Sequence, residues 1–181
     1  MTIQPDDKDW TWVVDRPCPQ CGFNPGEVDV TAMPSMIDRM SEEWRNVLLG
    51  DEVTLRPTPS TWSPLEYACH VRDVFRLFAT RLEAMITTDG AQFANWDQDA
   101  TAVALRYDRQ DPLVVANELE EAARGLAEQF RKVHGDLWGH RGLRSNGSQF
   151  TVRTIALYFA HDPVHHLWDV GGDPRLVVTG S

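Results

Sequence analysis

Residues 62–70 read WSPLEYACH, and this stretch sets where the central helix of the fold begins. Ser63 suits the N-cap position, Pro64 suits the first helical position, and a glutamate three residues after the cap completes a capping box. The pattern predicts a helix that continues to about Met85 or Thr87 and ends before the next glycine. The chain therefore contains a long, well-capped helix with a histidine inside its second turn.

Three other segments repeat apolar residues at helical spacing and are predicted to form long helices. They run over residues 32–49, 111–134 and 151–170. Asp111 followed by Pro112 repeats the cap-then-proline signal. Residues 91–110 are ambiguous and could hold a short helix over 99–107, and strand-like alternation is rare outside 175–178. Four amphipathic helices around one core predict an all-α chain folded as an antiparallel four-helix bundle.

The first thirty residues differ from the rest because they are rich in Pro, Asp and Gly and show no helical period. We predict an irregular N-terminal arm over residues 1–30, followed by the bundle over residues 31–181. A chain of 181 residues fits one domain and can bury a sizeable core without disulfides.

Composition excludes several classes of function. The formal net charge of −10 argues against nonspecific nucleic-acid binding, which depends on Lys and Arg contacts to phosphates. No run of about 18 apolar residues is present, and the N-terminus lacks the apolar stretch of a secretory signal. We expect a cytoplasmic protein that acts on a small molecule, with no nucleic-acid or membrane partner. A homodimer that pairs through an exposed helix face is a further expectation.

Three of the six histidines lie within residues 161–166, which read HDPVHH. Residues four apart share a helical face, so either His161 with His165 or Asp162 with His166 could bind one metal ion. Projection at about 100° per residue places His161 at the edge of the apolar arc and His165 just beyond it, with His166 near the opposite side. This favours His161 and His165 as ligands and leaves Asp162 and His166 as residues that orient the ligands or as alternates. A proline between the histidines weakens the spacing argument if it bends the helix.

A third ligand must come from another segment, and His70 is the best candidate because it lies inside a predicted helix among mostly apolar neighbours. Three neutral imidazoles that leave coordination positions open are typical of a catalytic metal site. The alternative interpretation is that each histidine is a surface residue or a hydrogen-bonded core residue.

Cys18 and Cys21 have the CxxC spacing of half a zinc ribbon, but the sequence contains no second CxxC. Three interpretations stay open. The cysteines are packed thiols or a local disulfide, or they are metal ligands completed by a partner chain or a distant residue, or they are a redox pair. Cys69 is predicted to lie in the core, since it diverges from the adjacent His70 on the helix.

Two motifs carry a resemblance to a known family. Residues 62–70 match the pattern WSxxE-xxxH, and residues 161–169, read as HDxxHHxxD, are similar to a second histidine motif. In this order, about ninety residues apart, they resemble the DinB-like superfamily over residues 31–170. The resemblance implies a four-helix bundle with an up-down-down-up connection.

The same resemblance implies a divalent metal, zinc or nickel, held by one histidine of the second helix and two of the last. Carried onto this chain, these ligands are His70, His161 and His165. In a branch of mycothiol-dependent maleylpyruvate isomerases the last motif resembles ExxxH followed by xxD. That pattern selects Asp162 and His166 instead, with the aspartate at position 169 following.

Characterised members of the family include thiol-dependent isomerases and bacillithiol or mycothiol transferases. A thiol bound to a divalent metal loses its proton near neutral pH and becomes a nucleophile. We therefore expect a metal-dependent enzyme that activates a low-molecular-weight thiol for transfer to, or isomerisation of, a small electrophile. The alternatives are metal-dependent hydrolysis at the same site and a stress protein that binds a metal or ligand without turnover.

Overall fold

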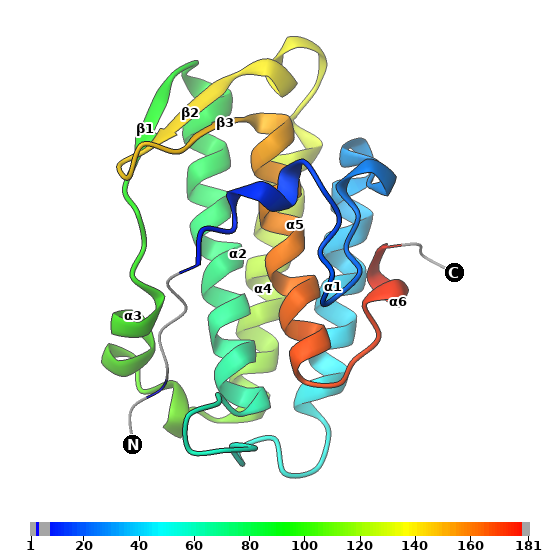
Figure 1. Ribbon diagram of the computed structural model, residues 1–181, viewed down its shortest axis with the longest axis vertical. Coiled ribbons are helices and arrows are strands. Elements are labelled where there is room, and N and C mark those ends of the chain that lie inside the picture. The colour runs from blue at the N-terminus through cyan, green and yellow to red at the C-terminus, as the bar shows by residue number, and fades with distance from the viewer. Residues whose placement is uncertain (1–2, 4–7, 179–181) are drawn as a thin grey trace.

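Four long helices form the body of the computed structural model, which describes residue 3 and residues 8–178 (Figure 1). They are α1 (Met33–Leu48), α2 (Pro64–Thr87), α4 (Pro112–Arg131) and α5 (Val152–Asp169). Figure 1 shows α1 and α5 running in one direction and α2 and α4 in the other, which is the up-down-down-up connection. The predicted four-helix bundle is confirmed.

The start of α2 follows the local signals of the sequence. The Ser63 hydroxyl accepts a hydrogen bond from the Glu66 backbone at 3.3 Å, and the Glu66 carboxylate accepts one from the Ser63 backbone at 2.9 Å. Arg56, from the preceding loop, adds an ion pair to the same carboxylate. At the start of α4, the Asp111 side chain accepts hydrogen bonds from the backbone of Leu113 and of the next residue. These caps fix where both helices begin.

Short elements fill the connections and the arm. The remaining helices are α3 (Gln98–Ala104) and α6 (Pro174–Val178), and the 3₁₀ turns are η1 (Thr11–Val14), η2 (Pro25–Glu27), η3 (Val30–Ala32), η4 (Tyr107–Arg109) and η5 (Gly135–Gly139). The ambiguous segment before α4 does contain a short helix. Residues 175–178, whose pattern resembles that of a strand, belong instead to helix α6. No helix among the described residues is long and apolar enough to cross a membrane.

A small sheet at one end of the bundle was not predicted. Its strands are β1 (Ala91–Phe93), β2 (Arg141–Arg144) and β3 (Gln149–Thr151), with β1 parallel to β2 and β2 antiparallel to β3. Each strand has only three or four residues, which is too short for alternation to be recognised. The sheet lies where α2 ends and α5 begins, and it joins the two long connections of the bundle (Figure 1).

Helix α5 is covered by different parts of the chain on different sides. It contacts α2 and α1, and the arm packs against it through η1 and η3. Arm residues Val13, Cys18, Phe23 and Val30 are almost fully buried, and the last three belong to the same core as the helices. Two neighbouring faces of α5 are therefore each covered by another part of the chain.

Candidate metal centres

The HDPVHH segment lies on one continuous helix in spite of Pro163. The Trp44 indole N–H donates to the Pro163 carbonyl at 3.2 Å, which ties the middle of α5 to α1. The rings of His161 and His165 lie with centroids 5.0 Å apart, as expected for one helical turn. The i to i+4 spacing therefore survives the proline.

One cluster of possible ligands, called here the His70 group, consists of His70, Asp162 and His166. Their ligand atoms all lie within 4.8 Å of one another. His70 Nε2 is 3.2 Å from Asp162 Oδ1, and His166 Nε2 is 4.0 Å from the same oxygen. His70 is fully buried on α2, whereas Asp162 and His166 on α5 are partly exposed. Three protein ligands arranged in this way leave room for further coordination.

Asp169 orients one ligand of the His70 group. His166 Nδ1 donates to Asp169 Oδ2 at 2.7 Å. A neutral imidazole that donates from Nδ1 presents Nε2 as an acceptor, and Nε2 is the nitrogen on the side of Asp162. Metal-binding histidines are commonly fixed by a carboxylate in this way.

Aromatic side chains surround the imidazole of His70. Its ring stacks on Trp96 at 5.3 Å with an interplanar angle of 12°, and Trp62 lies on another side at 5.5 Å. Tyr67 packs on the His166 ring at 4.9 Å. His70 Nδ1 is buried and has no hydrogen-bond partner among the described residues. The packing holds His70 in place while leaving one of its polar atoms unsatisfied.

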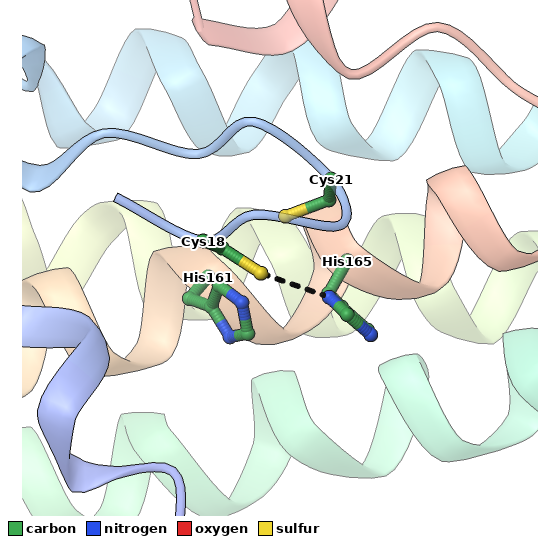
Figure 2. Close-up of side chains that lie close together, drawn as sticks. All are labelled: Cys18, Cys21, His161 and His165. Carbon is green, nitrogen blue, oxygen red and sulfur yellow. Dashed lines mark hydrogen bonds between the residues drawn. The ribbon is translucent and has the colours of Figure 1, made fainter. Parts of the chain in front are cut away.

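A second cluster, called here the cysteine–histidine group, consists of Cys18, Cys21, His161 and His165 (Figure 2). Its four ligand atoms also lie within 4.8 Å of one another, and all four residues are buried. Figure 2 shows the loop with the two cysteines lying over α5, with both thiols turned toward the imidazoles. Cys18 Sγ lies 3.7 Å from His165 Nδ1.

The structure divides the three histidines predicted to share one metal between these two groups. His70 lies with Asp162 and His166, the pair that the isomerase pattern selects, whereas His161 and His165 face the arm. The physical reason is that adjacent residues of α5 diverge by about 100° and each of the two resulting faces meets a different segment. The three-histidine ligand set stays a prediction, and the structure places His70 in one group of possible ligands and His161 and His165 in the other.

The protonation states of the α5 side chains suit metal binding. Burial, reinforced by the neighbouring His165, lowers the pKa of His161 to about 4, so this imidazole is neutral at physiological pH. Burial alone raises the pKa of Asp162, but the charge and hydrogen bond of His70 outweigh it and bring that pKa below its ordinary value. A neutral imidazole and an ionised carboxylate are the forms that coordinate metals.

Cys21 and Cys69 differ from reactive cysteines. All three cysteines of the chain are free thiols, and burial raises the pKa of both Cys21 and Cys69 to about 12. Thiols of this kind are poor nucleophiles, which weighs against the redox interpretation of the CxxC segment. Cys69 lies in the core as expected, with Sγ 3.5 Å from Gln110 Oε1.

A cleft of about 1020 Å³ adjoins both groups. Its walls include Trp62 and Trp96 beside His70, and the arm contributes Lys8 and Trp10. The WSxxE motif contains Trp62, but nothing in the sequence indicates that Trp62 or Trp96 lines a cleft. The connection that carries Trp96 has no periodic pattern, so no local signal predicts its path across the bundle.

Comparison with known proteins places the chain in a family. Residues 36–170 match the DinB superfamily, and no curated protein matches the chain. One similar solved structure is YfiT from Bacillus subtilis, described as a probable metal-dependent hydrolase with an unusual four-helix bundle topology. It has 12% identity and a TM-score of 0.68 over 91% of each chain.

A second similar structure is a mycothiol-dependent maleylpyruvate isomerase, with 13% identity and a TM-score of 0.61. The match covers 81% of this chain and 62% of the isomerase. At these identities the two structures show a shared fold. Since the family match spans most of the bundle, the chain belongs to the DinB superfamily.

Proposed function

We propose that the chain is a divalent-metal-dependent enzyme whose reaction takes place at the His70 group. The observation that carries the proposal is the convergence of two imidazoles and one carboxylate at a cleft. Three protein ligands with open positions are typical of catalytic sites, and zinc or nickel suits this donor set. A divalent ion there would act as a Lewis acid. It would lower the pKa of a bound thiol or water molecule to about 7 or below, so that the deprotonated form is available at neutral pH.

The residues around the His70 group hold its two imidazole rings in place. Asp169 fixes the ring of His166, and the ring of His70 is held by Trp96, which stacks on it, and by Trp62, which packs at a tilt. Asp162 is the one anionic ligand, so the three ligands together would leave a bound divalent ion with net positive charge. That charge favours an anionic nucleophile such as a thiolate.

The cleft has a size and polarity suited to a small polar molecule. Its volume of about 1020 Å³ lies at the upper end of ordinary ligand pockets. Arg144 on β2 lines the cleft and is held by hydrogen bonds to Asn146, Ser148 and Tyr158. A guanidinium fixed in this manner can bind the carboxylate of a substrate or of a low-molecular-weight thiol.

Thiol chemistry is the first candidate reaction. The grouping of His70 with Asp162 and His166, followed by Asp169, has the form that the resemblance to the thiol-dependent isomerases implies. We therefore propose that the enzyme activates a low-molecular-weight thiol and uses it for transfer to, or isomerisation of, a small electrophile. Metal-dependent hydrolysis is the second candidate, in line with the description of YfiT.

The test is turnover by the zinc- or nickel-loaded protein with a panel of thiols, including mycothiol and bacillithiol, and small electrophiles such as maleylpyruvate and monobromobimane. We expect thiol-dependent turnover that falls at least about 100-fold in His166→Ala, because loss of an outer-shell partner alone costs 10- to 100-fold. His134→Ala, at an exposed histidine outside both groups, is the matched control. Turnover of ester or amide substrates without thiol would favour hydrolysis, and no turnover in any assay would favour a binding protein.

A further inference from the structure

The cysteine–histidine group has the donor set and the spacing of a tetrahedral zinc site. With Zn–S distances of about 2.3 Å and Zn–N distances of about 2.0 Å, a tetrahedral ion separates sulfur from nitrogen by about 3.5 Å. Cys18 Sγ and His165 Nδ1 are 3.7 Å apart, and all four ligand atoms lie within 4.8 Å of one another. We propose that Cys18, Cys21, His161 and His165 bind a structural zinc ion that fastens the N-terminal arm to α5.

The burial of the group supports a closed site. The exposed fractions are 2% for Cys18, 8% for Cys21, 4% for His161 and 7% for His165. Four protein ligands complete a tetrahedron, so no position is left for substrate, unlike the three-ligand His70 group. Two thiolates also neutralise the charge of a divalent ion, which permits its burial among apolar side chains.

One buried nitrogen in the group is unsatisfied without an ion. His161 Nε2 has no hydrogen-bond partner among the described residues. Buried polar atoms nearly always form hydrogen bonds, so a buried nitrogen without a partner requires an explanation such as a bound ligand. Coordination by His161 to an ion shared with the cysteines provides one.

The loop that carries the cysteines is shaped to direct both thiols to one point. The Cys18 backbone N–H donates to the Phe23 carbonyl at 2.8 Å, and the Gly22 N–H donates to the Cys18 carbonyl at 3.0 Å. Gly22 has φ +75°, in the left-handed region that glycine adopts without strain. A disulfide between Cys18 and Cys21 would instead consume the thiol that lies 3.7 Å from His165 Nδ1.

The two groups are connected through Asp169. Its Oδ2 accepts from His166 Nδ1 at 2.7 Å, and its Oδ1 lies 4.0 Å from His165 Nε2. Trp10 of the arm packs against both imidazoles of the cysteine–histidine group. The centroid of its ring lies 5.2 Å from that of His161 and 5.0 Å from that of His165. Because Trp10 lines the cleft, an ion in the cysteine–histidine group would also hold one wall of the cleft in place.

The test measures metal content and the absorption of cobalt-substituted protein in four forms of the full chain. They are the unchanged protein, Cys18→Ser, Cys69→Ser and His70→Ala. Cys69→Ser is the matched control, because Cys69 is also buried but lies outside the group. We expect the thiolate-to-cobalt charge-transfer band and about one bound zinc to be lost in Cys18→Ser and retained in Cys69→Ser and in His70→Ala.

The same measurements distinguish this site from the proposed enzyme site. Loss of a metal ion in His70→Ala that leaves the thiolate band unchanged reports on the His70 group alone. A full thiolate band in Cys18→Ser, or no such band in the unchanged protein, would overturn the cysteine–histidine site. An intact mass two hydrogens lower without reductant would overturn it in favour of a disulfide.

Folding of the variant is controlled in two ways. Circular dichroism shows whether Cys18→Ser keeps the helical content of the bundle. The unchanged protein provides an independent readout, because a mercurial reagent that modifies the cysteines should release about one zinc per chain as the two thiols of the group react. Complete modification of the thiols without zinc release would contradict the proposal even if the variant does not fold.

Discussion

The two carboxylate oxygens of Asp169 face a histidine of each group: Oδ2 accepts a hydrogen bond from His166 Nδ1 at 2.7 Å, and Oδ1 lies 4.0 Å from His165 Nε2. Asp169→Asn keeps the size of the side chain but removes the charge that orients His166. We expect metal affinity at the His70 group, measured by competition with a chelator, to fall about 10- to 100-fold. Asp136→Asn, at an exposed aspartate of η5, should leave the affinity unchanged. Equal affinities for the unchanged protein and Asp169→Asn would show that the carboxylate does not support the site.

Glu66 shows how one carboxylate links stability to pH. Burial alone raises its pKa, but hydrogen bonds from Arg56 and Ser63 outweigh it and bring the pKa below its ordinary value of 4.5. Because the folded-state pKa is the lower one, this stabilisation is present above pH 4.5 and is lost as the pH falls through the folded-state value.

We expect Glu66→Gln to lower the free energy of unfolding at pH 7 by about 1–3 kcal/mol, since Arg56 and the helix cap lose a charged acceptor. The difference from the unchanged protein should shrink at acid pH, where the carboxylate of the unchanged protein also becomes neutral. Urea unfolding at several pH values between 7 and about 3 measures this. A difference that stays constant across the range would exclude ionisation of Glu66 as the cause.

Among the elements, the long helices could be predicted and the orientation of α5 could not. The helix starts at Ser63 and Asp111 depend on capping hydrogen bonds between residues two or three apart, so the sequence contains the whole signal. Which face of α5 meets α2 depends on where the arm packs, and the arm has no periodicity. The HDPVHH segment shows both possible pairs, His161 with His165 and Asp162 with His166. It does not show which pair meets His70 and which meets the cysteines of the arm.

Strand β2 makes a close contact with α2 that depends on a glycine. A Cβ at Gly142 would lie 2.7 Å from Met85 Sδ and 2.7 Å from Phe93 Cε1. Gly142→Ala should therefore lower the free energy of unfolding by about 1–3 kcal/mol, as overpacked sites do. Chemical denaturation checks this, with Gly139→Ala as the control because nothing lies within 4 Å of its Cβ. Equal losses in both variants would point to a backbone effect rather than to packing.

At the scale of the whole molecule, the arm is part of the bundle rather than an appendage. Cys18, Phe23 and Val30 join the same core as the helices, and Cys18 contacts His165, which lies 147 positions later in the chain. The arm was predicted from the sequence, and its CxxC spacing is visible there. Contacts between residues this far apart in the chain, however, leave no local sequence signal. The prediction could therefore name a distant residue as the completing ligand only as one alternative.

If zinc fastens the arm, hydrogen exchange should show it. In Cys18→Ser we expect the backbone amides of residues 18–23 to exchange at least about 10-fold faster than in the zinc-loaded unchanged protein, because their turn is no longer anchored. The amides of α4, which packs against α1 and α2, should keep their rates. Mass spectrometry of exchanged peptides measures both regions at once. Unchanged exchange in residues 18–23 would mean that apolar packing alone holds the arm.

The parallel arrangement of α2 and α4 obliges the chain to travel the length of the bundle between them, and this crossover brings Trp96 against His70 (Figure 1). The proposed metal ligands of the His70 group, by contrast, all lie on α2 and α5. The crossover and the helices therefore meet where Trp96 stacks on His70, and the rest of the crossover lies outside the His70 group. We expect substitutions in the crossover away from Trp96 to change which small molecules fit the cleft, while the three side chains of the His70 group keep their positions.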